Sequence, residues 1–155
     1  MIKYRSFKEK ELDQIFSLYV EGYSDLYGKS VQEHATQFVA LFQTALKEDV
    51  EGDMFVAEEN NVLIGFAVIH KEPTNEWKFG PIVVHPSFQR RGIGSYLLQM
   101  CIKFAQSKQI QQFYLKVHEH NQAAINLYKK FGFSTTNVFP SDLEGKNYLK
   151  MLYSL

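Results

Sequence analysis

The stretch Gly80–Gln106, GPIVVHPSFQRRGIGSYLLQMCIKFAQ, joins a strand-like apolar run to a helical pattern through two closely spaced glycines. A helix N-terminus leaves its first backbone N–H groups unpaired and carries partial positive charge, so such a junction can bind an anion like a pyrophosphate. Gly92 and Gly94 would let the backbone approach that anion closely. A lone G-x-G also occurs as an ordinary tight turn, so the rest of the chain has to decide between the two interpretations.

Two common nucleotide-binding motifs do not fit this junction. A dinucleotide fingerprint needs a third glycine at position 97, which is Leu97, and an acidic residue about twenty positions further on, where residues 110–114 offer none. A Walker A loop ends in Gly-Lys-Ser/Thr, but here Ser95 follows Gly94 directly. The sequence therefore argues against a Rossmann-type site and against ATP or GTP.

Hydrophobic periodicity and turn residues predict a mixed α/β chain with the element order β-α-α-β-β-β-α-β-α-β-β. The predicted ranges are 2–7, 9–28, 31–48, 53–59, 62–70, 76–85, 92–106, 112–118, 121–132, 134–139 and 147–155. Asn60 and Asn61 tolerate left-handed backbone and predict a hairpin. Pro81 cannot donate to a ladder, so we expect an interruption in its strand. A length of 155 residues with 45% hydrophobic content suits one domain spanning residues 1–155.

The charge balance and the cysteine content indicate which kinds of partner and which cellular setting the sequence favours. Seventeen basic residues balance seventeen acidic ones, so the sequence indicates neither nucleic acid nor a membrane surface as a partner, and favours a small molecule. Cys101 is the only cysteine and lies in an apolar pattern, which predicts a buried thiol and a reducing, cytoplasmic setting. The charged start and the lack of an apolar run of ~18 residues predict a soluble protein.

The segment Gln89–Gly94, QRRGIG, with its preceding strand and following helix, closely resembles the pyrophosphate loop of the GCN5-related N-acetyltransferases (GNAT family). A second segment, NQAAINLYKKFGF at residues 121–133, resembles another conserved element of that family. The two together cover about the central third of the chain. The resemblance implies a mixed, mostly antiparallel central sheet flanked by helices, with two neighbouring central strands that run parallel and splay apart to admit acetyl-CoA as co-substrate, without a metal.

The resemblance also implies specific site residues. Backbone groups of Ile82, Val83 and Val84 would pair with the pantetheine arm, and one of their N–H groups would polarise the thioester carbonyl, with the bulge expected at Pro81. The pyrophosphate loop would consist of Gln89, Arg90, Arg91, Gly92, Ile93, Gly94 and Ser95. Its two arginines are alternatively part of a plain solvent-exposed face.

Asn121 and Tyr128 share one face of the predicted fourth helix with Ala124 and Ile125, because spacings of three, four and seven residues return to the same side. The resemblance implies that Asn121 contacts the pantetheine arm, although it also fits an N-cap, and the two roles are compatible. It further implies that Tyr128 is the general acid that protonates the departing thiolate, with a core aromatic as the alternative.

The general base has no clear signal in the sequence. Glu76 ranks first because it sits early on the central strand, ahead of Glu72, His70 and His85, and an ordered water chain could replace all of them.

Two further patterns near the expected cleft have alternative interpretations. His118 and His120 stand at strand spacing, but no third ligand makes them a zinc site. Tyr19, Tyr23 and Tyr27 recur every four residues and form either core packing or a wall of the acceptor pocket.

The sequence thus predicts an N-acetyltransferase in which a primary amine attacks the thioester directly in a ternary complex. A CoA-binding sensor without efficient transfer, and a structural protein without a cofactor, are the competing hypotheses. The sequence does not name the acceptor, and a small-molecule amine is preferred over a protein lysine or a peptide N-terminus. The resemblance also allows a homodimer.

Overall fold

A seven-stranded, mostly antiparallel sheet forms the middle of the molecule in the computed structural model, which describes residues 1–141 and 145–155. The strand order is β1-β2-β3-β4-β5-β7-β6, and β4 and β5 are the parallel neighbours. The strands are β1 (Lys3–Ser6), β2 (Gly52–Glu59), β3 (Val62–Lys71), β4 (Trp77–Val84), β5 (Gln112–His118), β6 (Ser134–Pro140) and β7 (Asn147–Ser154).

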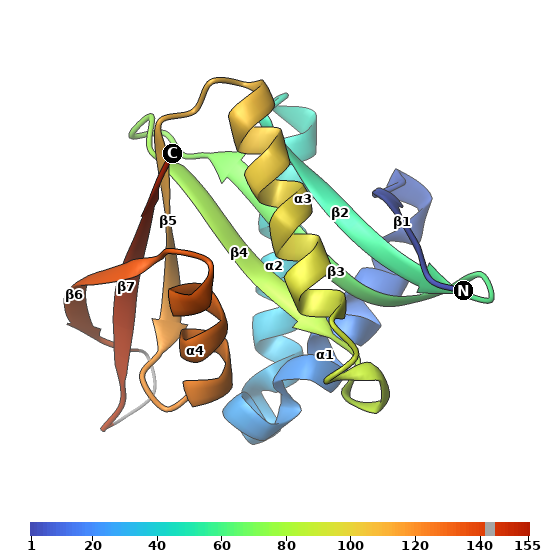
Figure 1. Cartoon of the computed structure of the whole chain (residues 1–155). Helices are drawn as coiled ribbons and strands as arrows, with labels where there is room; N and C mark the ends of the chain where they lie inside the picture. The colour runs from blue at the N-terminus through green and yellow to red at the C-terminus, as the bar shows by residue number, and fades with distance from the viewer. Residues whose placement is uncertain (142–144) are drawn as a thin grey trace.

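Four α-helices cover the two faces of this sheet (Figure 1). They are α1 (Leu12–Tyr27), α2 (Val31–Lys47), α3 (Ile93–Ser107) and α4 (Gln122–Lys130). Helices α3 and α4 lie on one face, and α1 and α2 lie on the other. The predicted element order and fold class are confirmed. Three single-turn 3-10 helices were not predicted: η1 (Glu9–Glu11), η2 (Gly28–Ser30) and η3 (Pro86–Phe88).

Each face of the sheet has its own hydrophobic core. On one face α3 buries Leu97, Leu98 and Cys101 completely, because positions one, three and four residues apart share a side of the helix. On the other face α1 buries Ile15 against Phe66. The prediction of a buried Cys101 thiol is confirmed, and burial raises its pKa far above the ordinary range.

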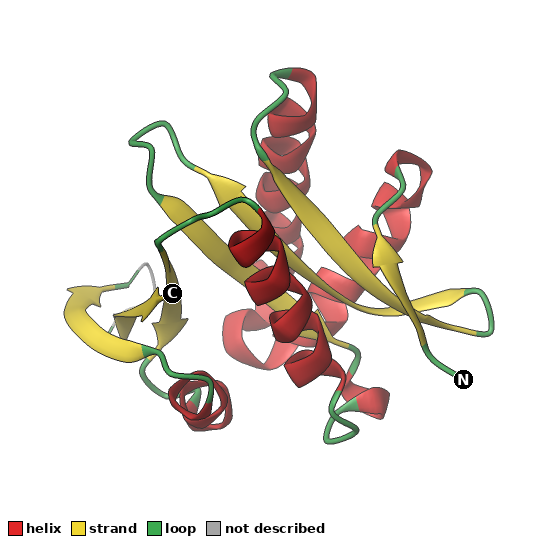
Figure 2. Ribbon diagram, turned by 45° about the horizontal axis from the view of Figure 1, so that its top comes forward, coloured by secondary structure: helices red, strands yellow, loops and turns green. Residues whose placement is uncertain are grey.

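Strands β4 and β5 lie together at one end and diverge at the other (Figures 1 and 2). Their ladder pairing is confined to Lys78 and Tyr114 in the described part of the chain. On its other side β4 stays paired with β3, but the register shifts between Ala67 and Ile69, opposite Gly80 and Pro81. This shift is the interruption expected at Pro81, and the divergence of β4 from β5 opens the sheet beyond it.

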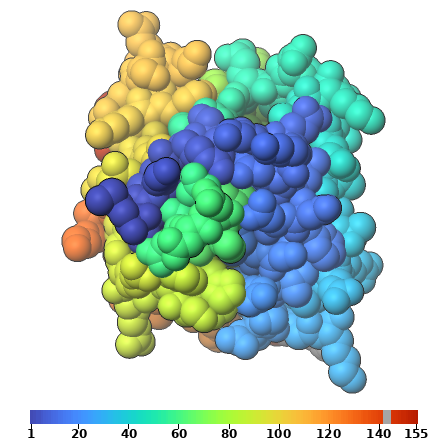
Figure 3. Space-filling model, turned by 90° about the vertical axis from the view of Figure 1, so that its right-hand side faces the viewer, coloured from blue at the N-terminus to red at the C-terminus, as the bar shows by residue number. Residues whose placement is uncertain are grey.

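The β2–β3 hairpin turns at Asn60 and Asn61, whose φ angles of 52° and 64° are left-handed as predicted. Figure 3 shows this hairpin beside the segment that precedes α3 on one face of the molecule, and Arg91 of that segment pairs with Glu59 of the hairpin. None of the helices formed by residues 1–141 and 145–155 is long and apolar enough to cross a membrane.

Candidate active site

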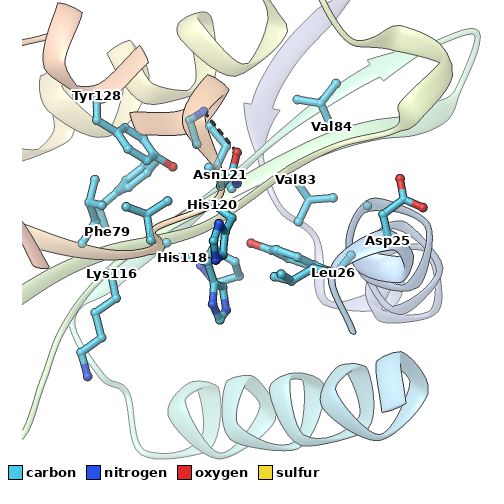
Figure 4. Close-up of a pocket in the computed structure, with 18 of the residues that line it drawn as sticks. Asp25, Leu26, Phe79, Val83, Val84, Lys116, His118, His120, Asn121 and Tyr128 are labelled. Carbon is cyan, nitrogen blue, oxygen red and sulfur yellow. Dashed lines mark hydrogen bonds between the residues drawn. The ribbon is translucent and has the colours of Figure 1, made fainter. Parts of the chain in front are cut away.

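A cleft of about 420 Å³ opens where β4 and β5 diverge (Figure 4). Its walls come from four elements: α1, the second half of β4, the end of β5, and the start of α4. The side chains and backbone that line it belong to Gly22, Tyr23, Asp25, Leu26, Phe79, Gly80, Pro81, Ile82, Val83, Val84, Gln89, Leu115, Lys116, Val117, His118, His120, Asn121, Ala124 and Tyr128.

A second recess, of about 460 Å³, lies at the N-terminus of α3. It is lined by the loop before α3, by β4 and by α4. The cleft and the recess have six lining residues in common, so they adjoin each other, and the two together are called the passage below. These shared residues are Ile82, Val84, Gln89, Asn121, Ala124 and Tyr128.

The loop before α3 turns through two left-handed residues, Arg90 at φ 65° and Gly92 at φ 79°. Gly92 is the N-cap of α3, and its carbonyl accepts the hydrogen bond of the Tyr96 N–H at 3.0 Å. The first N–H groups of such a helix have no intrahelical acceptor, so they are available to an anion in the recess. The Gln89 side chain donates to the Val84 carbonyl at 3.3 Å and joins the loop to β4.

The two arginines of the loop differ. Arg90 lines the recess. Arg91 instead pairs with Glu59 at 3.4 Å and lies over the ring of Phe88 at 5.3 Å, with 48% of its side chain exposed. Both side chains are exposed to solvent, and of the two only Arg90 lines the recess. Every other predicted site residue lines the cleft or the recess.

Asn121 is the N-cap of α4 and lines both parts of the passage. Its side-chain oxygen accepts a hydrogen bond from the Ala124 N–H at 3.2 Å, which satisfies one of the free donors of the helix. The amide nitrogen of the same side chain is a donor that this cap does not use. A capping role and a ligand contact are thus geometrically compatible.

Tyr128 is 5% exposed, and its ring packs edge-on against Phe79 with the centroids 6.1 Å apart. Phe133 contacts the same ring at 5.6 Å. Figure 4 shows the hydroxyl pointing from α4 into the cleft, on the side of Asn121. Burial raises the pKa of Tyr128 well above the ordinary value for a phenol, so the group is protonated at neutral pH and can donate a hydrogen bond.

The opposite wall belongs to α1, which approaches β4 closely at Gly22. A Cβ at this position would lie 2.4 Å from Cγ1 of Val83, so a larger residue would push the two elements apart. Tyr23 lines the cleft one residue further on, whereas Tyr19 is buried in the core against Phe38. Both interpretations of the tyrosine pattern therefore apply, because Tyr19 packs in the core and Tyr23 forms part of the cleft wall.

Glu76, the first-ranked candidate for the general base, does not line the cleft. It precedes β4 at the end where β4 and β5 still pair, and its carboxylate lies 3.5 Å from the Lys150 ammonium. Glu72 accepts a hydrogen bond from the Tyr114 hydroxyl.

The two histidines ranked with Glu76 also lie outside the cleft. His70 pairs with Lys78 in the ladder, and the imidazole of His85 lies 2.9 Å from Glu21 on the outer side of α1.

The cleft instead contains two histidines that sequence reasoning considered only as metal ligands. His118 is buried at the end of β5, with its ring 4.4 Å from that of Tyr148, and His120 follows in the turn to α4. Both line the cleft, opposite Leu26 of α1 (Figure 4). Their place at the diverging end of β5 was the available signal, because that end had to border the cleft.

One family of known proteins matches this chain. The family model described as acetyltransferase (GNAT) matches residues 12–133, which include the loop before α3 and helix α4. The chain belongs to the GNAT acetyltransferase family. The resemblance drawn from the two sequence motifs is confirmed.

Individual relatives of this GNAT chain include the N-alpha-acetyltransferase of Sulfurisphaera tokodaii, which is 34% identical over 114 residues, or 63% of this chain and 65% of that protein. The crystal structure of PH1933 from Pyrococcus horikoshii is 27% identical, with a TM-score of 0.79 over 100% of this chain and 99% of the other. PaiA N-acetyltransferase from Thermoplasma acidophilum, in complex with coenzyme A, has a TM-score of 0.80 at 20% identity over 100% and 99%. The last likeness concerns the fold alone. The chain spans about two thirds of the length of the curated relatives that it matches.

Proposed function

We propose that this chain transfers the acetyl group of acetyl-CoA to a primary amine by direct attack in a ternary complex, with residues 1–155 acting as one domain. The observation that carries the proposal is the passage with Asn121 and Tyr128 along both of its parts. One part lies at the N-terminus of α3 and the other beside α1, which suits a reaction between two substrates. Family membership and the coenzyme A complex of PaiA N-acetyltransferase support acetyl-CoA as the co-substrate.

The proposed cofactor site offers backbone groups more than charged side chains. The recess fits an anionic group, because the left-handed Gly92 and the first N–H groups of α3 face it. A Cβ at Gly94 would lie 3.8 Å from side-chain atoms of Ile82 and Val84, so this glycine stands directly against the β4 wall of the passage. Beyond Lys78, the β4 backbone groups directed at β5 have no ladder partner among the described residues and are free to pair with an extended arm.

Acetyl-CoA supplies an activated acyl group, and residues of this chain stabilise the charges that develop as it moves. A β4 N–H donates to the thioester oxygen, where a fixed donor stabilises developing negative charge without reorganisation. The amine nitrogen bonds to the acetyl carbon, the carbon–sulfur bond breaks, and the Tyr128 hydroxyl gives a proton to the departing sulfur. The attacking nitrogen loses its proton towards His118 or His120 at the acceptor end of the cleft.

We propose a small-molecule amine as the acceptor. The cleft of about 420 Å³ falls in the range of small-ligand sites, which is about 300–1,000 Å³. The Sulfurisphaera tokodaii relative carries N-alpha-acetylation in its name, so a peptide N-terminus is the competing acceptor.

Two measurements test the proposal. Acetyl-CoA at about 100 times its Kd should stabilise the fold by about 2.7 kcal/mol, which raises the Tm by roughly 5–10 °C. A panel of small amines and peptides should then release the thiol of coenzyme A in the presence of the protein. Stabilisation without thiol release from any amine would favour a CoA-binding sensor, and an unchanged Tm would favour a structural protein; either result would overturn the proposal.

A further inference from the structure

Three lysines project from one face of the sheet, between the end where β4 and β5 still pair and the cleft. Lys78 on β4 pairs with Tyr114 on β5, Lys116 follows two residues later on β5, and Lys150 on β7 lies directly opposite Lys116. Residues in register, or two apart along a strand, point to the same face. Lys116 lines the cleft, and Figure 4 shows its side chain extending from the wall so that the ammonium lies away from Tyr128.

This arrangement is unfavourable for folding. Like charges directly opposite each other on neighbouring strands destabilise a sheet, and Lys116 and Lys150 occupy such a pair. Burial lowers the pKa of Lys78; Glu72 opposes this shift, and Lys116 adds to it. Unfavourable charge arrangements of this kind occur preferentially at functional sites.

The carboxylates near these lysines are already engaged. Glu76 lies 3.5 Å from the Lys150 ammonium, and Glu72 accepts the Tyr114 hydroxyl. Among the described residues, no carboxylate forms an ion pair with Lys116, whose ammonium lies 6.0 Å from the ring centre of Phe139. Among the described residues that line the cleft, Lys116 therefore carries the ammonium group and Asp25 the carboxylate.

We propose that Lys116 binds a carboxylate of the acceptor, so that the acceptors are small amines that also carry one carboxylate. This inference rests on the proposed acetyl transfer and adds the acceptor class. A single ammonium group in the cleft matches one carboxylate, and a second carboxylate on the acceptor would be repelled by Asp25. Figure 4 shows Asp25 and Lys116 on opposite sides of the cleft, which orients a zwitterion with its ammonium towards α1 and its carboxylate towards β5.

A chain-length series of amines tests this directly. The probes are ω-amino acids with one to five methylene groups, each compared with the n-alkylamine of the same length, and kcat/KM is measured from the release of coenzyme A. For at least one length, the amino acid should exceed the alkylamine by about 10-fold or more in kcat/KM, since charge-assisted recognition of a carboxylate by an ammonium is worth about this factor. The effect should appear mainly in KM, because Lys116 binds the acceptor away from the reacting atoms.

Three variants separate specificity from catalysis. Lys116→Met keeps the apolar stem and should abolish the preference for the amino acid, and Lys116→Glu should reverse it in favour of diamines. Lys103→Met, on the exposed side of α3, should keep the wild-type preference. Equal use of amino acids and alkylamines, an unchanged preference in Lys116→Met, or binding of acetyl-CoA without acetylation of any probe would overturn the inference. Absence of both acetyl-CoA binding and thiol release would instead overturn the proposed function itself.

Discussion

Tyr128→Phe removes one hydroxyl and leaves the ring in its contacts with Phe79 and Phe133. We therefore expect the free energy of unfolding to change by no more than about 1 kcal/mol, whereas truncation to alanine would cost about 3–5 kcal/mol. If the phenol protonates the departing thiolate, kcat should fall by about 10²- to 10⁴-fold, which corresponds to about 2.7–5.4 kcal/mol in the barrier. Single-turnover release of coenzyme A measures this step, and calorimetric titration measures acetyl-CoA affinity, which should change little.

The pH dependence adds a second criterion. Because burial raises the pKa of Tyr128 above its ordinary value of 10.0, the phenol keeps its proton throughout the neutral and mildly alkaline range. An alkaline loss of rate below about pH 10 must therefore come from another group and should persist in Tyr128→Phe. A variant that keeps nearly full turnover, while chemistry limits the rate, would make Tyr128 a packing residue and would assign the proton to water or another donor.

Three further substitutions test the loop, a buried ion pair and the core. Gly92→Asp should abolish acetyl-CoA binding, since its side chain enters the recess at a left-handed φ of 79°, and unchanged affinity in a folded variant would contradict this role of the loop. Glu11→Gln should lower the free energy of unfolding at pH 7 by about 1–3 kcal/mol in urea titrations. Hydrogen bonds from Arg5 lower the pKa of Glu11, so the native carboxylate contributes its full stability above the ordinary value of 4.5, and the deficit of the variant should shrink as the pH falls below that value. Leu97→Ala, in a fully buried position, should cost about 2–5 kcal/mol in the same assay, and a cost below 1 kcal/mol would contradict the packing described for α3.

The features of the fold that depend on a few neighbouring residues were predictable from the sequence. Apolar spacing along α1, α2 and α3 and alternation along the strands identify each element, and Pro81 identifies the bulge because its missing N–H is a property of the residue itself. The order β5-β7-β6 was not predictable in the same way. It depends on pairing between strands that α4 and residues 141–146 separate along the chain, and the residues of β6 are exposed throughout, so no apolar pattern determines its position. The 3-10 turns are too short to show a period.

The sequence predicted site residues that lie together within one short segment, but not residues that distant segments bring to the same cleft. Residues 89–95 and 121–128 form local motifs, and the structure brings them together across the passage as expected. Glu76 was chosen as the candidate base because it is close to β4 in sequence, but closeness to β4 in sequence is not closeness to the cleft. Glu76 precedes the paired end of β4, whereas the cleft opens beyond Pro81 at the other end. Asp25 enters the same cleft from the distant helix α1, and only the three-dimensional arrangement reveals this, whereas the place of His118 and His120 at the end of β5 was a signal in the sequence.

The bulge at Pro81 connects the fold to the chemistry. A regular parallel pair would use the backbone groups of β4 and β5 along their whole length, but here pairing is confined to Lys78 and Tyr114 in the described residues. Buried backbone groups need partners, and the rings of Phe79 and Tyr128 fill the α4 side without supplying any along β4. An extended polar arm that pairs with this inner strand edge completes the sheet, as a peptide does when it adds to an exposed edge. The same divergence that creates the unpaired edge also places the Tyr128 hydroxyl beside it, so binding and proton donation depend on one deformation of the sheet.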